Sequence, residues 1–150
     1  MKKYILFLVL IFLVAASCEK DDFCIDPITP ELVIRFYDND NQTSTLVVTD
    51  LTVWPEGRDT ILLNQNLDSI AIPLDVNNPE TIYNFQSGDL IDQMTITYTV
   101  DEIFVSRSCG FKANFTDLDA NLESSNWIQA FAIISTTVED ESAAHIEIFH

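Results

Sequence analysis

Every second residue is apolar in the stretch Met94-Thr95-Ile96-Thr97-Tyr98-Thr99-Val100. A repeat of two is that of a half-buried β-strand, because successive side chains leave the backbone on opposite faces. The stretch therefore predicts a strand that turns its Met, Ile, Tyr and Val side chains toward a core and its threonines toward solvent.

Similar short runs recur on both sides of this stretch, about every ten residues. They predict strands at residues 32–37, 46–54, 59–63, 69–74, 81–85, 103–108, 127–138 and 145–149. Clusters rich in Asn, Asp, Pro and Gly predict turns at residues 38–41, 55–57, 64–66, 77–79, 87–89 and 139–142. Residues 111–125 fit neither pattern, and we expect a loop there with a short helical turn at residues 118–122. The whole pattern predicts an all-β fold, an antiparallel β-sandwich of about seven to nine strands, either immunoglobulin-like or transthyretin-like.

The chain is short and strongly acidic. It has 150 residues, of which 24 are Asp or Glu and 7 are Lys or Arg, for a formal charge of −17. This length suits a single folded domain. The scarcity of basic residues argues against nucleic acid as a partner, because phosphate binding needs clustered Lys and Arg. It argues equally against adsorption to anionic lipid through overall charge.

The first seventeen residues have the order of a secretory signal. Lys2 and Lys3 precede the apolar run 4–14, which is too short to span a bilayer as a helix, and small residues fill positions 15–17. Because Cys18 comes next, the segment resembles a bacterial lipoprotein signal, in which the cysteine is lipidated and starts the mature chain. The alternative is an ordinary secretory signal with an incidental cysteine. We expect a signal peptide at residues 1–17, a lipidated acidic tether at 18–30 and one β-sandwich domain at 31–150.

The residues behind this cysteine suggest a destination. Lys20, Asp21 and Asp22 resemble the export signal that sends Bacteroidota lipoproteins to the outer face of the outer membrane. We expect a protein held in the outer membrane by lipid and exposed at the cell surface, with the periplasmic face as the alternative. The acyl chains must supply the attachment, because the acidic protein surface would be repelled by anionic headgroups, and each buried CH₂ contributes ~0.8 kcal/mol.

The other two cysteines form an even pair. In an oxidising compartment Cys24 and Cys109 predict a disulfide that joins the start of the domain to a late strand. Two separate buried thiols are the alternative. A zinc site is not expected, because the cysteines and the distant His145 and His150 lack the spacing of zinc ligands.

Four segments of the chain also carry a family resemblance. They are residues 32–38, 68–74, 105–110 and 144–148. Together they resemble a family of small Bacteroidota lipoproteins of unknown function. The resemblance implies an exported, lipid-anchored β domain and implies no activity.

Motifs that carry catalysis are missing from the sequence. It contains no G-x-S-x-G nucleophile elbow, no P-loop and no H-E-x-x-H, and we expect neither an enzyme nor a cofactor. We expect His145 to share a solvent-facing strand face with Glu147 and Phe149. Arg107 shares a predicted strand face with Cys109, where it either pairs with a carboxylate or contacts an anion or partner.

Two weaker patterns suggest a metal and a modification. Asp117, Asp119, Asn121 and Glu123 place oxygen side chains at alternate positions, as at the start of an EF-hand loop, and are our calcium candidates. The pattern departs from an EF-hand at the sixth position, which is Leu122. Thr60 and Ser69 lie in Asp-Thr-Ile and Asp-Ser-Ile tripeptides, which resemble O-glycan acceptors of exported proteins in the same bacteria.

These observations favour a non-enzymatic binding or envelope module that meets a glycan or protein partner. Exposed aromatic side chains are the feature that such a role predicts, with Trp54, Trp127 and Phe149 as candidates, although the two tryptophans also suit packing in the core or at a sheet edge. The alternatives are a small enzyme or inhibitor with an unrecognised site and a calcium-binding adhesion module. Nothing in the sequence indicates an oligomeric state.

Overall fold

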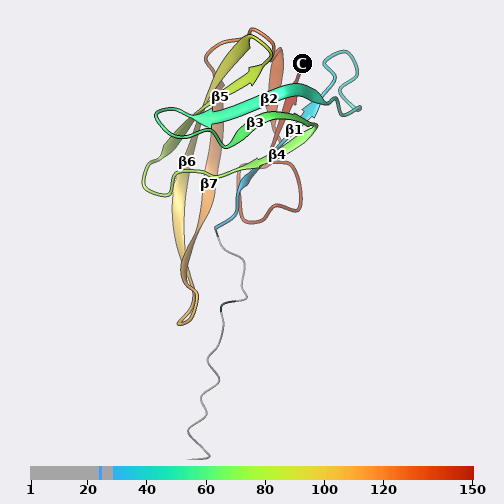
Figure 1. The fold of residues 1–150 in the computed structure, drawn as a ribbon. Coiled ribbons are helices and arrows are strands. Elements are labelled where there is room, and N and C mark those ends of the chain that lie inside the picture. The colour runs from blue at the N-terminus through green and yellow to red at the C-terminus, as the bar shows by residue number, and fades with distance from the viewer. Residues whose placement is uncertain (1–23, 25–28) are drawn as a thin grey trace, which may run out of the picture.

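The computed structural model describes Cys24 and residues 29–150, which fold as two packed β-sheets (Figure 1). The nine strands are β1 (Leu32–Tyr37), β2 (Val48–Pro55), β3 (Leu62–Leu67), β4 (Ser69–Ile72), β5 (Glu80–Ser87), β6 (Leu90–Ser106), β7 (Gly110–Leu122), β8 (Ala130–Ile133) and β9 (Ile146–Phe149). The predicted all-β sandwich is confirmed. In this part of the chain no helix is long and apolar enough to cross a membrane.

One sheet has the strand order β4-β1-β9-β8, and the other has the order β3-β2-β5-β6-β7. Neighbouring strands are antiparallel except for β1 and β9, which run parallel from Ile34 opposite Ile146 to Tyr37 opposite Phe149. A parallel pair needs a crossover connection, and here all the intervening strands form it. The first and last strands therefore lie side by side at the centre of the smaller sheet.

The core lies between the two sheets and follows the predicted alternation. Met94, Ile96 and Tyr98 are buried, whereas Thr97 and Thr99 are exposed. The largest side chains that are almost fully buried come from both sheets: Leu32, Ile34, Phe36, Leu51, Ile72, Tyr83, Phe85, Met94, Ile96, Phe115, Ile128 and Ile146. Burial of this apolar surface on both inner faces holds the sandwich together.

Several boundary predictions were wrong, including the strands predicted at residues 59–63 and 127–138, where the structure has β3 (Leu62–Leu67) and β8 (Ala130–Ile133). The strands predicted at residues 94–100 and 103–108 form one long strand, β6, and residues 111–125, predicted as a loop with a helical turn, are mostly strand β7. The turn predicted at residues 64–66 lies within β3, where Asn64 has a φ of 49° beside a register shift between β2 and β3. Asn tolerates this left-handed conformation, which β-bulges use as well as turns.

A second bulge bends the β6–β7 hairpin. Thr97 pairs with Asp119 and Thr99 with Thr116, so two residues of β7 lie opposite one residue of β6. Asp117 occupies the bulge with a φ of 53°. An extra residue on one strand increases the local twist and turns the strand pair aside.

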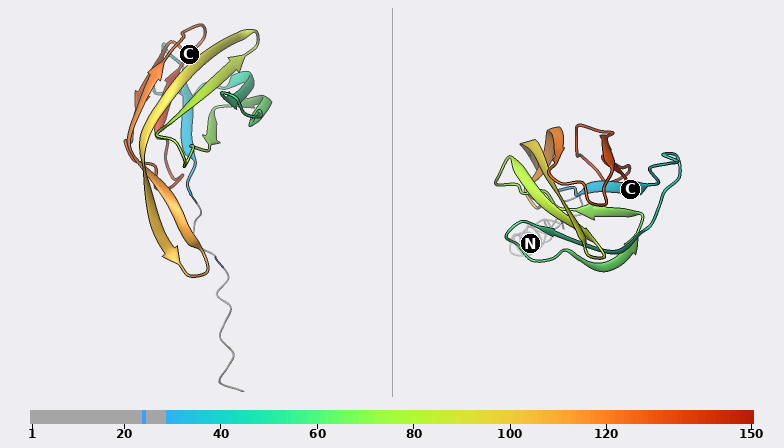
Figure 2. Two further views of the ribbon diagram at one scale, coloured as in Figure 1. Left: turned by 90° about the vertical axis from the view of Figure 1, so that its left-hand side faces the viewer. Right: turned by 90° about the horizontal axis from the view of Figure 1, so that it is seen from above.

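Past this bulge and the buried Phe115, the hairpin leaves the sandwich as an arm, which we define as residues 101–112 (Figure 2). β6 pairs with β5 only as far as Thr97, and from Thr99 to Ser106 it pairs with β7 alone. The end of the arm is bonded to the chain that leads into the domain, because Cys109 forms a disulfide with Cys24, whose Cα lies 4.9 Å away. The predicted disulfide is confirmed.

A buried carboxylate organises the opposite end of the sandwich. Asp92 is fully buried near the start of β6 and accepts backbone hydrogen bonds from Asn126 at 2.6 Å and from Trp127 and Ile128 at 2.8 Å. Burial disfavours the charged form, but these N–H donors outweigh it and hold the pKa of Asp92 below its usual value. Asp92 thereby fixes the loop between β7 and β8.

Candidate functional site

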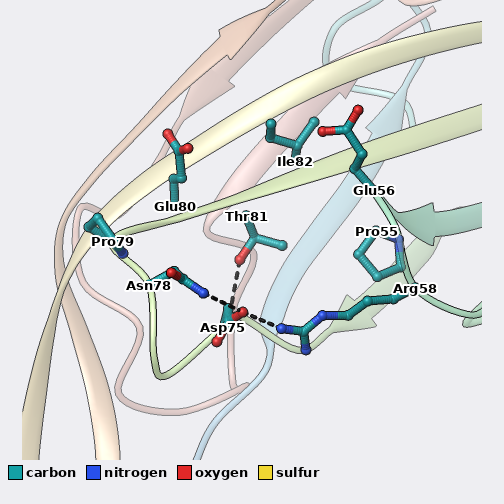
Figure 3. Close-up of a pocket in the computed structure, with 9 residues that line it drawn as sticks. All are labelled: Pro55, Glu56, Arg58, Asp75, Asn78, Pro79, Glu80, Thr81 and Ile82. Carbon is teal, nitrogen blue, oxygen red and sulfur yellow. Dashed lines mark hydrogen bonds and ion pairs between the residues drawn. The ribbon is translucent and has the colours of Figure 1, made fainter.

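A polar hollow opens at the side of the sandwich, where the end of β2 meets the connection from β4 to β5 (Figure 3). It consists of two adjoining cavities of about 300 and 310 Å³, of which the first has a mostly polar lining and the second a mostly apolar one. Both cavities are lined by Pro55, Arg58, Asp75 and Thr81. The hollow lies at the end of β2 and the start of β5, two interior strands of the larger sheet, beside the connection that leaves β4.

Asp75 is the fixed centre of this hollow. Its carboxylate accepts hydrogen bonds from the Asn77 backbone N–H at 2.9 Å and the Asn78 amide at 3.0 Å, and it forms an ion pair with Arg58. The Asn77 N–H, followed by the Asn78 amide, holds the pKa of Asp75 below its usual value. The carboxylate is therefore ionised and already engaged at neutral pH.

Three hydroxyl groups beneath Asp75 form hydrogen bonds with backbone groups. Thr81 Oγ1 accepts from the Asp75 N–H at 3.0 Å, and the Tyr98 hydroxyl donates to the Asp75 carbonyl at 3.0 Å. The Tyr83 hydroxyl donates to the Pro73 carbonyl. Burial raises the pKa of both tyrosines, so their hydroxyls stay protonated and remain donors.

The rim of the hollow carries the groups that are open to a ligand. The Arg58 side chain is 62% exposed, and Glu56 and Glu80 are exposed beside it. Arg58 retains guanidinium N–H groups beyond the one that binds Asp75, and the two glutamates are acceptors. Such a rim can hydrogen-bond a polar ligand, whereas the groups beneath it are held in structural bonds.

A smaller hollow of about 210 Å³ brings a serine, a histidine and an aspartate near one another. The Ser142 hydroxyl donates to Asp140, not to the imidazole of His145. His145 Nδ1 in turn accepts from the Val33 N–H at 3.0 Å. A general base needs a free lone pair directed at the nucleophile, and this geometry does not supply one.

A family model described as a family of unknown function, DUF6452, matches residues 50–150. The chain belongs to the DUF6452 family. The matched region begins within β2 and ends after β9, so it covers the hollow and the arm of this DUF6452 member. No curated protein and no solved structure matches the chain.

The structure does not gather the calcium candidates into a loop. Asp117, Asp119 and Asn121 lie along extended strand β7, with Glu123 just after it. Asp117 is the bulge residue, and Glu123 accepts hydrogen bonds from Asn121 and Thr95. Within residue 24 and residues 29–150, no three or more His, Cys, Asp or Glu side chains lie where they could share a metal ion. Calcium binding at these positions stays a prediction that no contact supports.

The remaining candidates are the lipidation and export residues and the two glycan acceptors, of which the structure describes only the glycan acceptors. Cys18, Lys20, Asp21 and Asp22 lie outside the described residues. Thr60 is exposed in the connection from β2 to β3, whereas Ser69 is half-buried and donates to the Ile34 carbonyl at 3.3 Å. Of the two proposed glycan acceptors, Thr60 is the accessible one.

His145 and Arg107 lie differently from what we expected. His145 is buried against Val33, only 5% exposed, and not on a solvent face. The predicted strand around Arg107 ends at Ser106, so Arg107 is exposed in the turn at the end of the arm. Among the described residues no carboxylate pairs with Arg107.

The three candidate aromatics are not exposed, and the two tryptophans fit the packing role that the sequence also suggested. Trp54 and Trp127 are half-buried, the Trp127 indole donates to the Phe85 carbonyl at 3.0 Å, and Phe149 is buried. Phe104 and Phe111 are exposed instead, on the arm. Phe104 and Phe111 are equally distant from the point between Arg107 and Ser108, which was a usable signal only if residues 90–122 were taken as one hairpin.

Proposed function

We propose that this protein is a lipid-anchored, non-enzymatic binding module of the outer membrane, exposed at the cell surface. The sequence contains three cysteines, and the disulfide uses Cys24 and Cys109. Cys18 is thus left for the acyl chains, at the position where lipoprotein signals place it. A disulfide also suits an oxidising compartment outside the cytoplasm.

The arrangement of the polar hollow supports binding over catalysis. Asp75, Thr81 and Tyr98 are held in one another's hydrogen bonds, so none is poised to take or give a proton. Arg58 and the two glutamates of the rim remain open to a ligand. Hydroxyl-rich ligands such as glycans offer both the acceptors and the donors that such a rim can bind.

The anchor is tested by comparing the wild-type chain with Cys18→Ser in cells. We expect radiolabelled palmitate in the wild-type protein and none in the variant, together with partition of the wild type into the detergent phase. Surface exposure is tested with protease added to intact cells. Joint substitution of Lys20, Asp21 and Asp22 by Ala should then protect the protein while leaving it lipidated. Equal labelling of wild type and Cys18→Ser would contradict the anchor.

The hollow is tested with a panel of purified glycans, read as a shift in the midpoint of thermal unfolding. We expect a stabilising glycan to lose its effect in Arg58→Ala. Arg35→Ala, which alters an exposed arginine on β1, is the matched control. A glycan that stabilises Arg58→Ala as much as wild type does not bind at this hollow. Turnover of a glycan by the wild-type protein would favour the enzyme alternative.

A further inference from the structure

The tip of the arm, residues 103–112, presents an aromatic pair to solvent. Phe104 and Phe111 lie opposite each other in the β6–β7 register, with ring centroids 5.3 Å apart. They are 57% and 68% exposed. The pair therefore contributes nothing to the core between the sheets. An exposed apolar cluster on a projecting element is typical of a surface that contacts a membrane or another protein.

The charge of the tip is opposite to that of the rest of the chain. Residues 103–112 contain Arg107 and Lys112 and no acidic residue, although the whole chain has 24 acidic against 7 basic residues. Aromatic rings next to Lys and Arg are the combination that settles at the boundary between lipid headgroups and acyl chains. The basic residues also favour anionic headgroups, which the remaining surface would repel.

The disulfide limits how far the tip can lie from a lipid anchor. Cys109 belongs to the tip and is bonded to Cys24, the sixth residue after Cys18. Six residues of fully extended chain span at most about 20 Å. If Cys18 is lipidated, the tip is confined to that distance from the membrane surface. This restriction favours the bilayer over a distant protein as the surface that the tip meets.

We propose that the arm tip contacts the lipid interface, with Phe104 and Phe111 at the base of the headgroups and Arg107 and Lys112 near the headgroup phosphates. This inference rests on the proposed anchor at Cys18. Acyl chains and arm tip then form two attachment points, which set the orientation of the sandwich relative to the bilayer. The acidic sheets and the polar hollow are held away from the headgroups.

The experiment uses the full lipidated chain in vesicles of phosphatidylethanolamine and phosphatidylglycerol, prepared with or without brominated acyl chains. Phe104→Trp and Phe111→Trp each add an indole at the tip. Leu63→Trp is the control, because Leu63 is 64% exposed on β3, at the opposite edge of the sheet from β7. The emission of wild-type protein, which holds Trp54 and Trp127, is subtracted.

We expect brominated lipid to quench the added indole at least twofold in both tip variants, with a blue shift, and to leave Leu63→Trp unquenched. Joint substitution of Arg107 and Lys112 by Glu should reduce the quenching of Phe111→Trp on these vesicles. Thermal unfolding of each variant checks that the fold is kept.

The outcomes separate the two proposals. Vesicles that carry the lipidated protein without quenching either tip variant overturn the tip contact and leave the anchor intact. Equal quenching of Leu63→Trp overturns it as well, because the sandwich then has no set orientation. A protein that neither floats with vesicles nor has the mass of an acylated Cys18 contradicts the anchor, and the tip contact with it.

Discussion

His145 shows how a single buried acceptor links stability to pH. Burial lowers the pKa of its imidazole below the ordinary value, and Nδ1 accepts from the Val33 N–H. In the unfolded chain the imidazole titrates near ~6.5, so below that pH the unfolded state binds more protons than the folded state. The stability that neutral His145 provides is therefore complete above about pH 6.5 and is lost as the pH falls toward the lower folded pKa.

We predict that the free energy of unfolding falls between pH 7.5 and pH 5.5 in wild type and falls less in His145→Asn. Asn places an acceptor near the position of Nδ1 but does not titrate. His145→Ala should cost ~1–3 kcal/mol at pH 7.5, since the Val33 N–H is left buried without its acceptor. Urea unfolding at both pH values measures these differences. Identical pH slopes in wild type and His145→Asn would contradict this role.

Asp92 leads to a second prediction, with its own pH range. Its folded pKa lies below the unfolded value, so its contribution is present above about pH 4 and lost as the pH falls through the folded pKa. Asp92→Asn should cost ~1–3 kcal/mol at pH 7. Urea unfolding should show that the difference in free energy of unfolding between wild type and Asp92→Asn becomes smaller toward pH 3. Asp89→Asn, an exposed turn residue, is the control and should stay within ~0.5 kcal/mol of wild type.

The alternation of residues predicts the face of Asp92 but not its purpose. Asp92 precedes Met94, Ile96 and Tyr98 at the same spacing of two, so period two already places it on the inward face. Its three backbone donors come from the loop at residues 126–128, which is distant in sequence. His145 was misplaced for a related reason: its acceptor role depends on Val33, more than a hundred residues away.

At the scale of elements, the arm is the part that separates from the core. Its end is held by the Cys24–Cys109 disulfide, whose removal the chain-entropy model values at about 4–5 kcal/mol as a ceiling. The disulfide joins the arm to the tether and does not join one sheet to the other. We therefore predict that the double variant Cys24→Ser, Cys109→Ser loses less free energy of unfolding than this ceiling, ~1–3 kcal/mol. Urea unfolding gives this value, and a chain that fails to fold would contradict it.

Hydrogen exchange in the same variant tests where the disulfide acts. The backbone amides of residues 103–112 should lose protection, whereas those of residues 94–97, which pair with both β5 and β7, should keep theirs. Uniform loss of protection would show that the disulfide supports the whole sandwich.

The elements themselves could be predicted where apolar and polar residues alternate, as in residues 94–100 of β6, or where a short apolar run occurs, as in β1. The bulges could not, because Asn and Asp favour positive φ in turns and bulges alike, and only pairing with a neighbouring strand decides between the two. The polar hollow was missed since its residues come from separate connections, at residues 55–58 and 73–81, that meet only after both sheets form.

At the scale of the molecule, we expect β1 to be required for folding, although it lies outside the region that the family model matches. The match begins at residue 50, yet β1 at residues 32–37 pairs with both β4 and β9 in the smaller sheet. We predict that a chain of residues 50–150 shows no cooperative thermal unfolding by circular dichroism, whereas residues 29–150 do. Both chains carry Cys109→Ser, because each lacks Cys24. A cooperative transition in the shorter chain would contradict a central role for β1.

The pairing of β1 with β9 also sets when this molecule can finish folding. Ile34 cannot meet Ile146 until a ribosome has added the residues between them, which at 5–20 residues per second takes roughly 5–20 s. During that delay β1 is an apolar strand without either its neighbour β9 or a closed core, and so is prone to aggregate. The nascent chain therefore suits a cell that keeps it unfolded, by a holding chaperone or by a translocation channel, until its last strand is available.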